Sequence, residues 1–583
     1  MKFAHYFLQN RHFLSAFFIK RPVLTKIVLF LTSFAYFLFS LLIFYREYNK
    51  NMNKIVLAQI NTIAGNIENN AQKIIDCIKK AKDNNANIII FPKFALTGFP
   101  FGDILKRHVS ILKRQEDALE RIKEECENIV VIMNYADFDG ENQIKIIRNK
   151  EILENDSFEI NGETFGLGFS STVDTLIKCT CDESRTGSEY RRNNLLSSLA
   201  KGSYSKVIYV NKVGYGNNRV FDGSSRIYDK FGNLIFRAKT FEEDFAIFDE
   251  NINRIEPLPI GMEKEIDIEN FNLDYSNDLD RTYKSIVFAI KEYFKQNGFK
   301  KAVLGLSGGL DSTISAVLLV DALGKENVYG ISMPSKITSQ GSKDDARILA
   351  ENLGINFFEV PLAESIDATK NLLSFAFDNT NADKYEKSTT MENLQARTRA
   401  TILWSVANEH KQMLTIATSD KSEAYIGYAT VNGDMSGGFA TIADVTKTKL
   451  FALGDFLNKN REQKNAIPQT ILEKPPGAEL KINPLTGKTV FAEEDNMPYP
   501  FLDEIIWFVE NFSYGFDDLM NHEFYYEKNN NLSKEQKEEW IKKFFWKQHC
   551  AVFKWHILPP SVITDINTIN SVEYHQPIIS KVY

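Results

Sequence analysis

The residues best suited to phosphate chemistry occupy positions 305–312 and read Gly-Leu-Ser-Gly-Gly-Leu-Asp-Ser. An apolar run over 302–306 precedes this octapeptide, and a stretch of helical character over 313–322 follows it. A strand, a glycine-rich turn and a helix N-terminus in this order direct backbone N–H groups and the helix dipole at an anion. The placement predicts a phosphate cradle; the alternative is an ordinary glycine-rich turn between a strand and a helix.

Side chains in the same turn extend the set of ligand groups. Ser307 and Ser312 offer hydroxyl donors, whereas Asp311 suits a phosphate site only if a Mg²⁺ ion bridges the two negative groups. The turn is not a Walker loop, because no Gly-Lys-Ser/Thr follows at the required spacing. The predicted nucleotide-binding residues of the turn are Gly305, Leu306, Ser307, Gly308, Gly309, Leu310, Asp311 and Ser312.

Length and composition bound the class of protein. A chain of 583 residues is too long for one core, so we expect two or three domains. Hydrophobic and charged shares of 44% and 25% are those of a soluble globular protein, and a net charge of -7 argues against a nucleic-acid surface. The five cysteines show no zinc-ligand spacing and suit a reducing cytosol, so we expect a cytoplasmic protein.

The N-terminal region is a compositional exception. Residues 27–45 carry no charge and are long enough to span a bilayer. One interpretation is a membrane anchor or an uncleaved signal; the other is that translation starts at Met52, which directly opens an apolar strand. We favour the second, since an anchor would place an ATP-consuming enzyme outside the cell.

The rest of the chain reads as two α/β units. We expect a hydrophobic extension over 1–51, a first domain over 52–250, a polar linker over 251–280 and a second domain over 281–583. Apolar runs separated by turn residues predict the elements of the first domain. They are strands at 55–60, 87–91, 129–133, 165–169, 175–178 and 207–210, a helix at 69–84, and turns at 214–218 and 229–233.

Four later segments make a family resemblance specific. They are ENLQARTRA at 392–400, TSDKSEAYIGY at 418–428, NGDMSGGFATIADVTKT at 432–448 and EKPPGAEL at 473–480. With the phosphate turn and NVYGISMPS at 327–335, they resemble the NAD⁺ synthetases, in the large glutamine-dependent form of that family. The resemblance implies a nitrilase-like αββα sandwich followed by a doubly wound parallel sheet.

The resemblance also implies a reaction. Members of the family adenylylate the carboxylate of deamido-NAD⁺ with ATP, and ammonia then displaces AMP to give NAD⁺. Carboxylates are poor acyl donors until they are activated, and an anionic transition state at phosphorus needs metal ions, lysine and backbone donors. ATP and Mg²⁺ are therefore expected, together with an assembly that is at least a homodimer.

Site residues carry over by position. The resemblance implies that Asp311 and Glu423 hold Mg²⁺, that Lys447 binds phosphate, and that Met333 and Thr418 contact ATP. The alternative for Glu423 is a purely electrostatic role at a helix start, and for Lys447 a solvated surface lysine.

Three further residues are expected at the dinucleotide. Arg397 and Lys554 match positions that hold deamido-NAD⁺, and Asp434 belongs to a loop that closes on it. Arg397 has a structural ion pair as its alternative. Trp555 stands where the family has a second basic residue, and Gly477 replaces the usual serine, so the sequence departs from the family there.

The first domain resembles the amidase that supplies ammonia in this family, through residues 58–70, 91–105 and 209–233. That chemistry needs a glutamate base, a lysine and a cysteine nucleophile. Lys93 stands at the glutamate position and Ser170 at the cysteine position, and Lys150 is a loose match to the lysine. A lysine is cationic at neutral pH and cannot accept a proton, and a serine without a base is a poor nucleophile.

We therefore expect an NAD⁺ synthetase with a degenerate amidase domain, using free ammonia or ammonia from a partner protein. An active glutaminase with a displaced nucleophile, Cys179 or Cys181, is the alternative. Two other classes stay open: another amidating ATP-pyrophosphatase, and a non-catalytic scaffold.

Overall fold

The fold is taken from a computed structural model, which describes residues 53–101, 109–137, 139–168, 173–250, 275, 278–379, 387–477, 493 and 496–569. The apolar stretch 27–45, Ser170 and nearly all of the expected linker lie outside these residues. No helix within the described ranges is long and apolar enough to cross a membrane.

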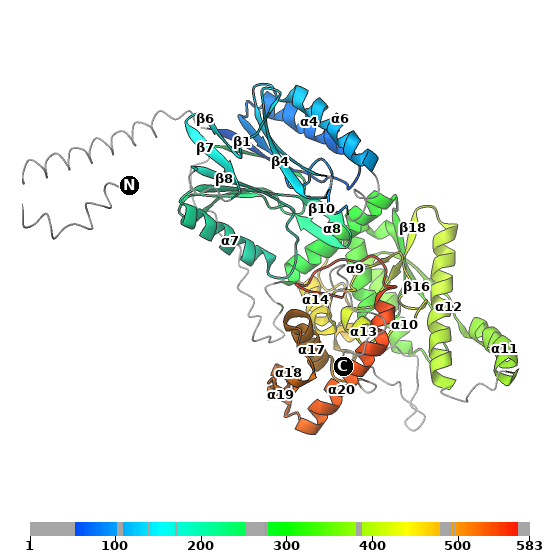
Figure 1. The fold of residues 1–583 in the computed structure, drawn as a ribbon. Coiled ribbons are helices and arrows are strands. Elements are labelled where there is room, and N and C mark those ends of the chain that lie inside the picture. The colour runs from blue at the N-terminus through cyan, green and yellow to red at the C-terminus, as the bar shows by residue number, and fades with distance from the viewer. Residues whose placement is uncertain are drawn as a thin grey trace, which may run out of the picture.

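Two six-stranded sheets face each other in the first domain, with helices on both outer faces (Figure 1). The first sheet has the order β14-β1-β2-β3-β4-β5, and the second has the order β13-β12-β9-β8-β7-β6. The elements of the first sheet and its helices are β1 Lys54–Gln59, α4 Ile67–Asp83, β2 Ile88–Ile90, α6 Val109–Glu125, β3 Val130–Ala136, β4 Asn142–Arg148, β5 Glu151–Leu153 and β14 Asp244–Asp249. Those of the second sheet are β6 Ser157–Ile160, β7 Glu163–Leu167, β8 Thr175–Thr180, α7 Ser188–Ser203, β9 Lys206–Asn211, β12 Arg226–Tyr228 and β13 Leu234–Arg237.

Alternation along the strands explains the four layers. In β1, Ile55 and Leu57 pack against the second sheet, whereas Val56 and Ala58 pack under α4 and α6. Successive side chains of a strand point to opposite faces, so a strand apolar on both faces must be covered twice. The predicted αββα sandwich is confirmed.

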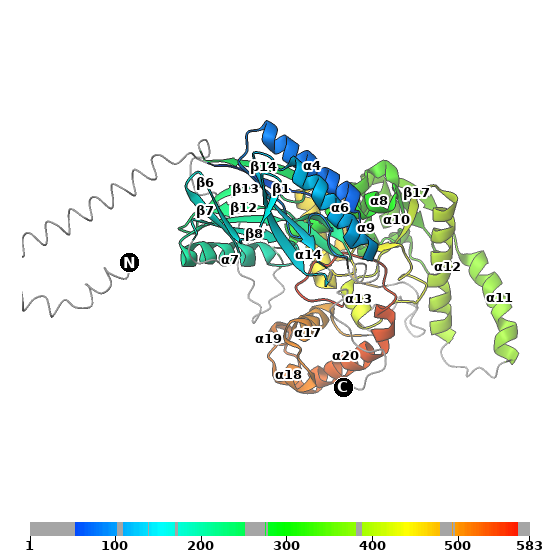
Figure 2. The same ribbon diagram turned by 45° about the horizontal axis from the view of Figure 1, so that its top comes forward.

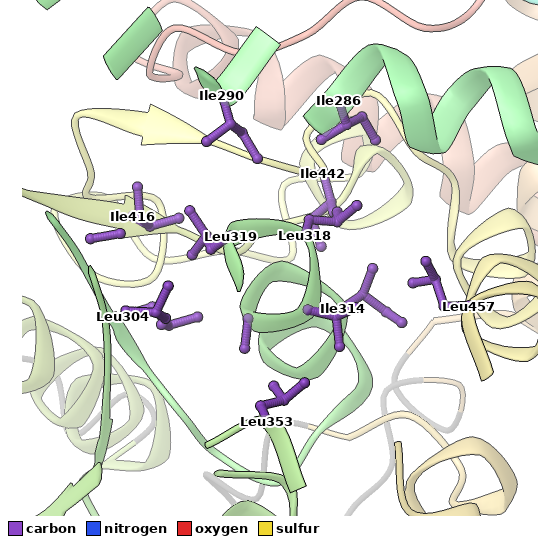
Figure 3. Packing of buried hydrophobic residues seen from close by; sticks show 14 of the residues in the cluster. Ile286, Ile290, Leu304, Ile314, Leu318, Leu319, Leu353, Ile416, Ile442 and Leu457 are labelled. Carbon is purple, nitrogen blue, oxygen red and sulfur yellow. The ribbon is translucent and has the colours of Figure 1, made fainter. Parts of the chain in front are cut away.

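The second domain is built on one parallel sheet of order β17-β16-β15-β18-β19, so the chain starts in the middle and winds outward both ways. Side chains from α8, β15, α9 and β18 meet in its core (Figure 3). The predicted doubly wound sheet is confirmed. Its elements are α8 Leu279–Asn297, β15 Lys301–Gly305, α9 Leu310–Leu323, β16 Val328–Ser332, α10 Gln340–Leu353, β17 Asn356–Glu359, α11 Ala363–Asn379, α12 Lys387–Glu409, β18 Met413–Ala417, α13 Lys421–Tyr425, β19 Phe439–Ala440, α14 Lys447–Asn460 and α15 Gln469–Glu473.

An aromatic helical layer follows that sheet and gathers on one side of it (Figure 2). Its helices are α17 Tyr499–Phe512, α18 Phe516–Asn521, α19 Tyr525–Asn530 and α20 Lys534–Trp555. Sequence patterning predicts α20 only as far as Lys547 and extends α18 back to Ser513. The structure ends α17 at Ser513, whose φ of 57° lies in the left-handed region that terminates helices.

One predicted turn is wrong in its extent. Residues 214–218 were expected to form a turn, but Val213–Gly216 is a strand, β10, paired with β11 at Arg219–Asp222. Only Asn217 and Asn218 make the turn, with φ of 49° and 64°. Asparagine tolerates this left-handed conformation, which two-residue hairpins require. The hairpin packs into the core of the second domain through Tyr215 and Val220.

Buried charges fix the second sheet of the sandwich to α7. The Arg226 guanidinium is fully buried and donates two hydrogen bonds of 2.9 Å to the carboxylate of Glu189. Removing one member of such a pair leaves the other charge buried without compensation.

We expect Arg226→Met to destabilise the first domain by about 3–5 kcal/mol, because Glu189 keeps its charge but loses its main partner. Urea unfolding followed by circular dichroism measures this. Lys239→Met is the matched control, since Lys239 pairs with Glu242 on the surface and should leave the midpoint unchanged. Equal midpoints for the two variants would contradict the prediction.

Candidate active site

The site lies where the order of the parallel sheet reverses. β15 is flanked by β16 on one side and β18 on the other, so the loops after β15 and β18 leave the same edge and diverge. Such a switch point is where open α/β sheets bind ligands. The loop after β15 carries the predicted phosphate cradle, and the loop after β18 carries Thr418 and leads into α13.

The cradle depends on a glycine with no room for a side chain. Gly308 has φ of +78°, and a Cβ there would lie 2.1 Å from the carbonyl oxygen of Ser342 in α10. The hydroxyls of Ser307 and Ser312 lie 3.1 Å apart, and the N–H of Gly309 donates to the Ser307 hydroxyl. The turn is therefore closed on itself beside the N-terminus of α9, as an anion site requires.

One buried lysine joins three carboxylates at this edge. The Lys447 ammonium, at the start of α14, lies 2.6 Å from Asp311, 2.5 Å from Asp420 and 3.1 Å from Glu423. The sequence predicts Lys447, Asp311 and Glu423 as site residues, and the structure brings their side chains together. The alternative of a solvated surface lysine is wrong, because the side chain of Lys447 is only 1% exposed.

Asp420 was missed by the sequence analysis. It precedes α13, and its Oδ1 accepts the N–H of Glu423 at 2.9 Å, which leaves Oδ2 directed at Lys447. Aspartate three residues before a helical glutamate is an N-cap pattern, which was the available signal. That signal places Asp420 at the helix start but does not say that it faces Asp311.

Burial governs the ionisation of these groups. Burial raises the pKa of Asp420 to about 7, and burial with repulsion from neighbouring carboxylates raises the pKa of Glu423 well above its usual range. Burial alone would lower the pKa of the Lys447 ammonium. The attraction of Asp311 and Asp420 outweighs this effect, so the pKa of the ammonium is raised. Three acidic groups thus compete for one cation, and a further cation at this edge would favour their charged forms.

The carboxylates suit a divalent cation. Oxygen atoms of Asp311, Asp420 and Glu423 all lie within 4.8 Å of one another. Mg²⁺ prefers oxygen ligands and is commonly shared between one or two carboxylates and a substrate phosphate. The donor set therefore fits the metal expected from the sequence, with Asp420 as a further acidic group beside it.

Met333 and Thr418, which are also expected to contact ATP, lie in the loops after two different strands, β16 and β18. Met333 follows β16 and is buried, and its methyl group lies 3.2 Å from where a Cβ on Gly305 would stand. Its carbonyl accepts the Nε–H of Arg399 at 3.2 Å. Thr418 is half-buried in the loop after β18. Their contacts with ATP stay predictions.

The three residues expected at the dinucleotide all meet the loop over 427–434. Arg397 donates to the carbonyl of Val431 at 3.1 Å, and Lys554 donates to the carbonyls of Gly427 and Ala429, both at 2.7 Å. Asp434 accepts the N–H of Thr430 at 2.7 Å. Among the described residues, Arg397 makes this backbone contact rather than the ion pair that was its alternative. The roles of Arg397, Asp434 and Lys554 toward substrate stay predictions.

The first domain separates two of its three expected amidase positions. Lys93 follows the carboxyl end of β2, whereas Lys150 lies in the turn between β4 and β5 and pairs with Glu124 on the surface. β2 runs parallel to β3, and β3 pairs with β4 so that Val130, at its start, opposes Arg148. Lys150 therefore lies at the opposite end of the sheet from Lys93 and does not share a site with it.

Cys179 and Cys181, the alternative nucleophiles, are both half-buried. Cys179 lies in β8, as expected, and the Sγ–H of Cys181 donates to the carbonyl of Lys93 at 3.0 Å. Burial raises the pKa of both thiols to about 12. A cysteine nucleophile acts as the thiolate, so this shift disfavours both thiols as nucleophiles.

Comparison with known proteins agrees with this arrangement. A family model described as NAD synthase matches residues 282–548. The glutamine-dependent NAD⁺ synthetase of Aquifex aeolicus is 31% identical over 524 residues, covering 78% of this chain and 88% of that protein. That of Thermotoga maritima is 31% identical over 519 residues, with the same coverage of 78% and 88%.

Two solved structures share the whole two-domain arrangement. The glutamine-dependent NAD⁺ synthetase of Acinetobacter baumannii in complex with adenosine diphosphate has a TM-score of 0.64 at 26% identity, covering 91% of this chain and 98% of that chain. The enzyme of Cytophaga hutchinsonii has a TM-score of 0.75 at 19% identity, with the same coverage of 91% and 98%, and this shows the fold alone.

The fold and the site define an ATP-using ligase that forms carbon–nitrogen bonds. Within that class, the chain belongs to the glutamine-dependent NAD⁺ synthetase family.

We expect Gly308→Ala to abolish ATP binding, because the new methyl group would overlap the carbonyl of Ser342 and force the cradle apart. Calorimetric titration with ATP measures the loss. Gly341→Ala is the control: it lies one residue from Ser342, has nothing within 4 Å of an added Cβ, and should bind ATP normally. Full ATP affinity in the Gly308 variant would disprove the placement of the phosphates.

Proposed function

We propose that this chain converts deamido-NAD⁺ to NAD⁺ with ammonia as its nitrogen donor, while its amidase-like domain lacks glutaminase activity. The synthetase part follows from the family. The nitrogen donor is inferred from one observation: Lys93 occupies the position that the resemblance assigns to the glutamate base. Its cationic side chain lies 4.9 Å from the centre of the Phe94 ring and cannot accept a proton from a nucleophile.

The site residues divide the chemistry between them. In the first step a substrate carboxylate oxygen attacks the α-phosphorus of ATP, and the bond to the β-phosphate breaks to release pyrophosphate. The cradle around Gly308 and the Lys447 ammonium stabilise the charge on the leaving pyrophosphate. Mg²⁺ held by Asp311 and Glu423 would supply Lewis acidity at the phosphates.

The second step forms the amide. Ammonia attacks the activated carbonyl carbon, the bond to the AMP oxygen breaks, and the extra proton leaves the nitrogen. Arg397, Asp434 and Lys554 are proposed to hold the dinucleotide through the loop that they fasten over 427–434. The dimeric assembly and cytoplasmic location expected from the sequence stay predictions.

Glutamine as donor is the second candidate, and the names of the relatives favour it, because those compared above are called glutamine-dependent. Glutamine hydrolysis would require a nucleophile other than Ser170. Cys179 and Cys181 are the alternative nucleophiles, but burial raises the pKa of both thiols to about 12, which disfavours the reactive thiolate.

The nitrogen donor is tested by NAD⁺ formation from ATP, Mg²⁺ and deamido-NAD⁺, with ammonium or glutamine as the single nitrogen source. We expect turnover with ammonium and none above background with glutamine, because the positions expected for the base and the nucleophile hold Lys93 and Ser170. Adding a separate glutaminase to the glutamine reaction should restore turnover. Equal rates with both donors would establish the glutamine-dependent reading, and Cys181→Ala and Cys179→Ala would then identify the thiol.

The metal assignment is tested by Asp311→Asn. We expect NAD⁺ formation to fall at least about a hundredfold and Mn²⁺ binding in the presence of ATP to weaken, because one anionic ligand is lost. Asp344→Asn, on the exposed face of α10, is the control and should change neither quantity. Unchanged Mn²⁺ affinity in the Asp311 variant would remove it from the metal site.

A further inference from the structure

An irregular segment over 559–569 lies between the two domains, and residues 561–565 within it are buried. Ser561, Val562, Ile563 and Thr564 are each at most 2% exposed, although no helix or strand includes them. Backbone N–H and C=O groups without secondary structure must find other partners when buried. In this segment, which we call the interdomain segment, those partners come from both domains.

The amidase-like domain holds one side of the interdomain segment. Tyr215 of β10 donates its hydroxyl to the carbonyl of Ser561 at 2.6 Å. Asn218, at the hairpin turn, accepts the N–H groups of Ser561 and Ile563 through its side-chain and backbone oxygens, at 2.9 and 2.7 Å. The N–H of Thr186 donates to the carbonyl of Thr564 at 2.8 Å.

The synthetase site holds the other side. Asp444 accepts the N–H groups of Thr564 and Asp565, at 2.7 and 2.9 Å. Lys421, which is fully buried, pairs with Asp444 at 3.3 Å and with Asp565 at 3.2 Å. Lys421 is the first residue of α13 and directly follows Asp420. The interdomain segment is thus fastened to the back of the helix that carries Glu423.

A second connection reaches α14. The Lys449 ammonium, two residues beyond Lys447 and 2% exposed, lies 2.7 Å from Asp278. Thr186 of the amidase-like domain donates its hydroxyl to the same carboxylate at 2.7 Å and lies 3.3 Å from Lys449. A single hydroxyl group of the first domain therefore contacts both the helix of the phosphate lysine and the interdomain segment.

We propose that the amidase-like domain positions the metal and phosphate residues of the synthetase site, through Thr186 and the interdomain segment. This gives the domain a function that is independent of glutamine hydrolysis, and it rests only on the synthetase activity. Thr186, Lys421 and Lys449 are positioning residues, since each acts through a neighbour on α13 or α14.

The need for such support follows from the size of α13. A helix of five residues cannot hold its own conformation in isolation, because nucleating a helix costs more than so few hydrogen bonds return. Asp420 and Glu423 must nevertheless be kept near Asp311 against the repulsion of like charges. The fastening of Lys421 to Asp444, Glu510 and Asp565 supplies the rigidity that the helix lacks.

The test is Thr186→Val in the full-length chain, which keeps the shape of the side chain and removes its hydroxyl. We expect the affinity for Mn²⁺, measured by calorimetry with a non-hydrolysable ATP analogue, to fall roughly tenfold, as loss of a buried hydrogen bond and a shifted helix would produce. The KM for ATP with ammonium as donor should rise in parallel. The binding measurement needs no nitrogen donor, so it stands apart from the outcome of the glutamine test.

Thr164→Val is the matched control, since Thr164 bonds Asp174 at the far edge of the second sheet. It should leave Mn²⁺ affinity unchanged. Tyr215→Phe removes a different bond to the interdomain segment and should weaken Mn²⁺ binding in the same direction. If both variants lower the thermal midpoint but bind Mn²⁺ within twofold of the unaltered protein, the domain is only a structural neighbour and the proposal fails.

Discussion

The arrangement of the synthetase site depends on one ammonium group buried among three carboxylates. Lys447 contacts Asp311, Asp420 and Glu423, which come from the starts of two different helices and from the residue before one of them. One ammonium does not fully stabilise three buried carboxylates, as the raised pKa values of Asp420 and Glu423 indicate, so the charged form of the cluster requires a fixed backbone and a further cation. The parallel sheet supplies the first condition by bringing the loops after β15 and β18 to one edge.

The two domains differ in how far their residues match the expected chemistry. In the second domain the phosphate cradle and its acidic partners stand together, whereas in the first domain a lysine occupies the expected base position. Buried ion pairs are nevertheless formed among the described residues of the first domain: Arg226 pairs with Glu189, and Arg192 with Asp222. A domain that had no remaining task would tolerate the loss of such contacts, which are costly to leave half-made. Their presence agrees with a supporting role toward the synthetase site.

Local patterns predicted only some of the elements around the site. The strand and helix on either side of the phosphate turn and strands of the sandwich core follow from apolar periodicity and turn residues, whereas β18, α13 and α14 were not predicted. The hairpin at Gly214 was misjudged because glycine and asparagine signal a turn, whereas pairing of Val213 with Asp222 extends both strands into that region. Lys150 was misplaced for a related reason: its sequence neighbourhood does not reveal at which end of the sheet it lies.

The sequence by itself determined the phosphate cradle, because eight consecutive residues contain the glycines, hydroxyls and carboxylate that phosphate binding needs. The reaction class followed from the resemblance of later segments to a known family, and the placement of Lys93 and Ser170 at the amidase positions stays a prediction of that resemblance. Only the tertiary structure decided that Asp420 faces Asp311 and that Lys421, Lys449 and Thr186 join the two domains. Their partners lie far away in the chain, as Lys449 does from Thr186, and such pairs are set by the packing of whole domains rather than by local propensity.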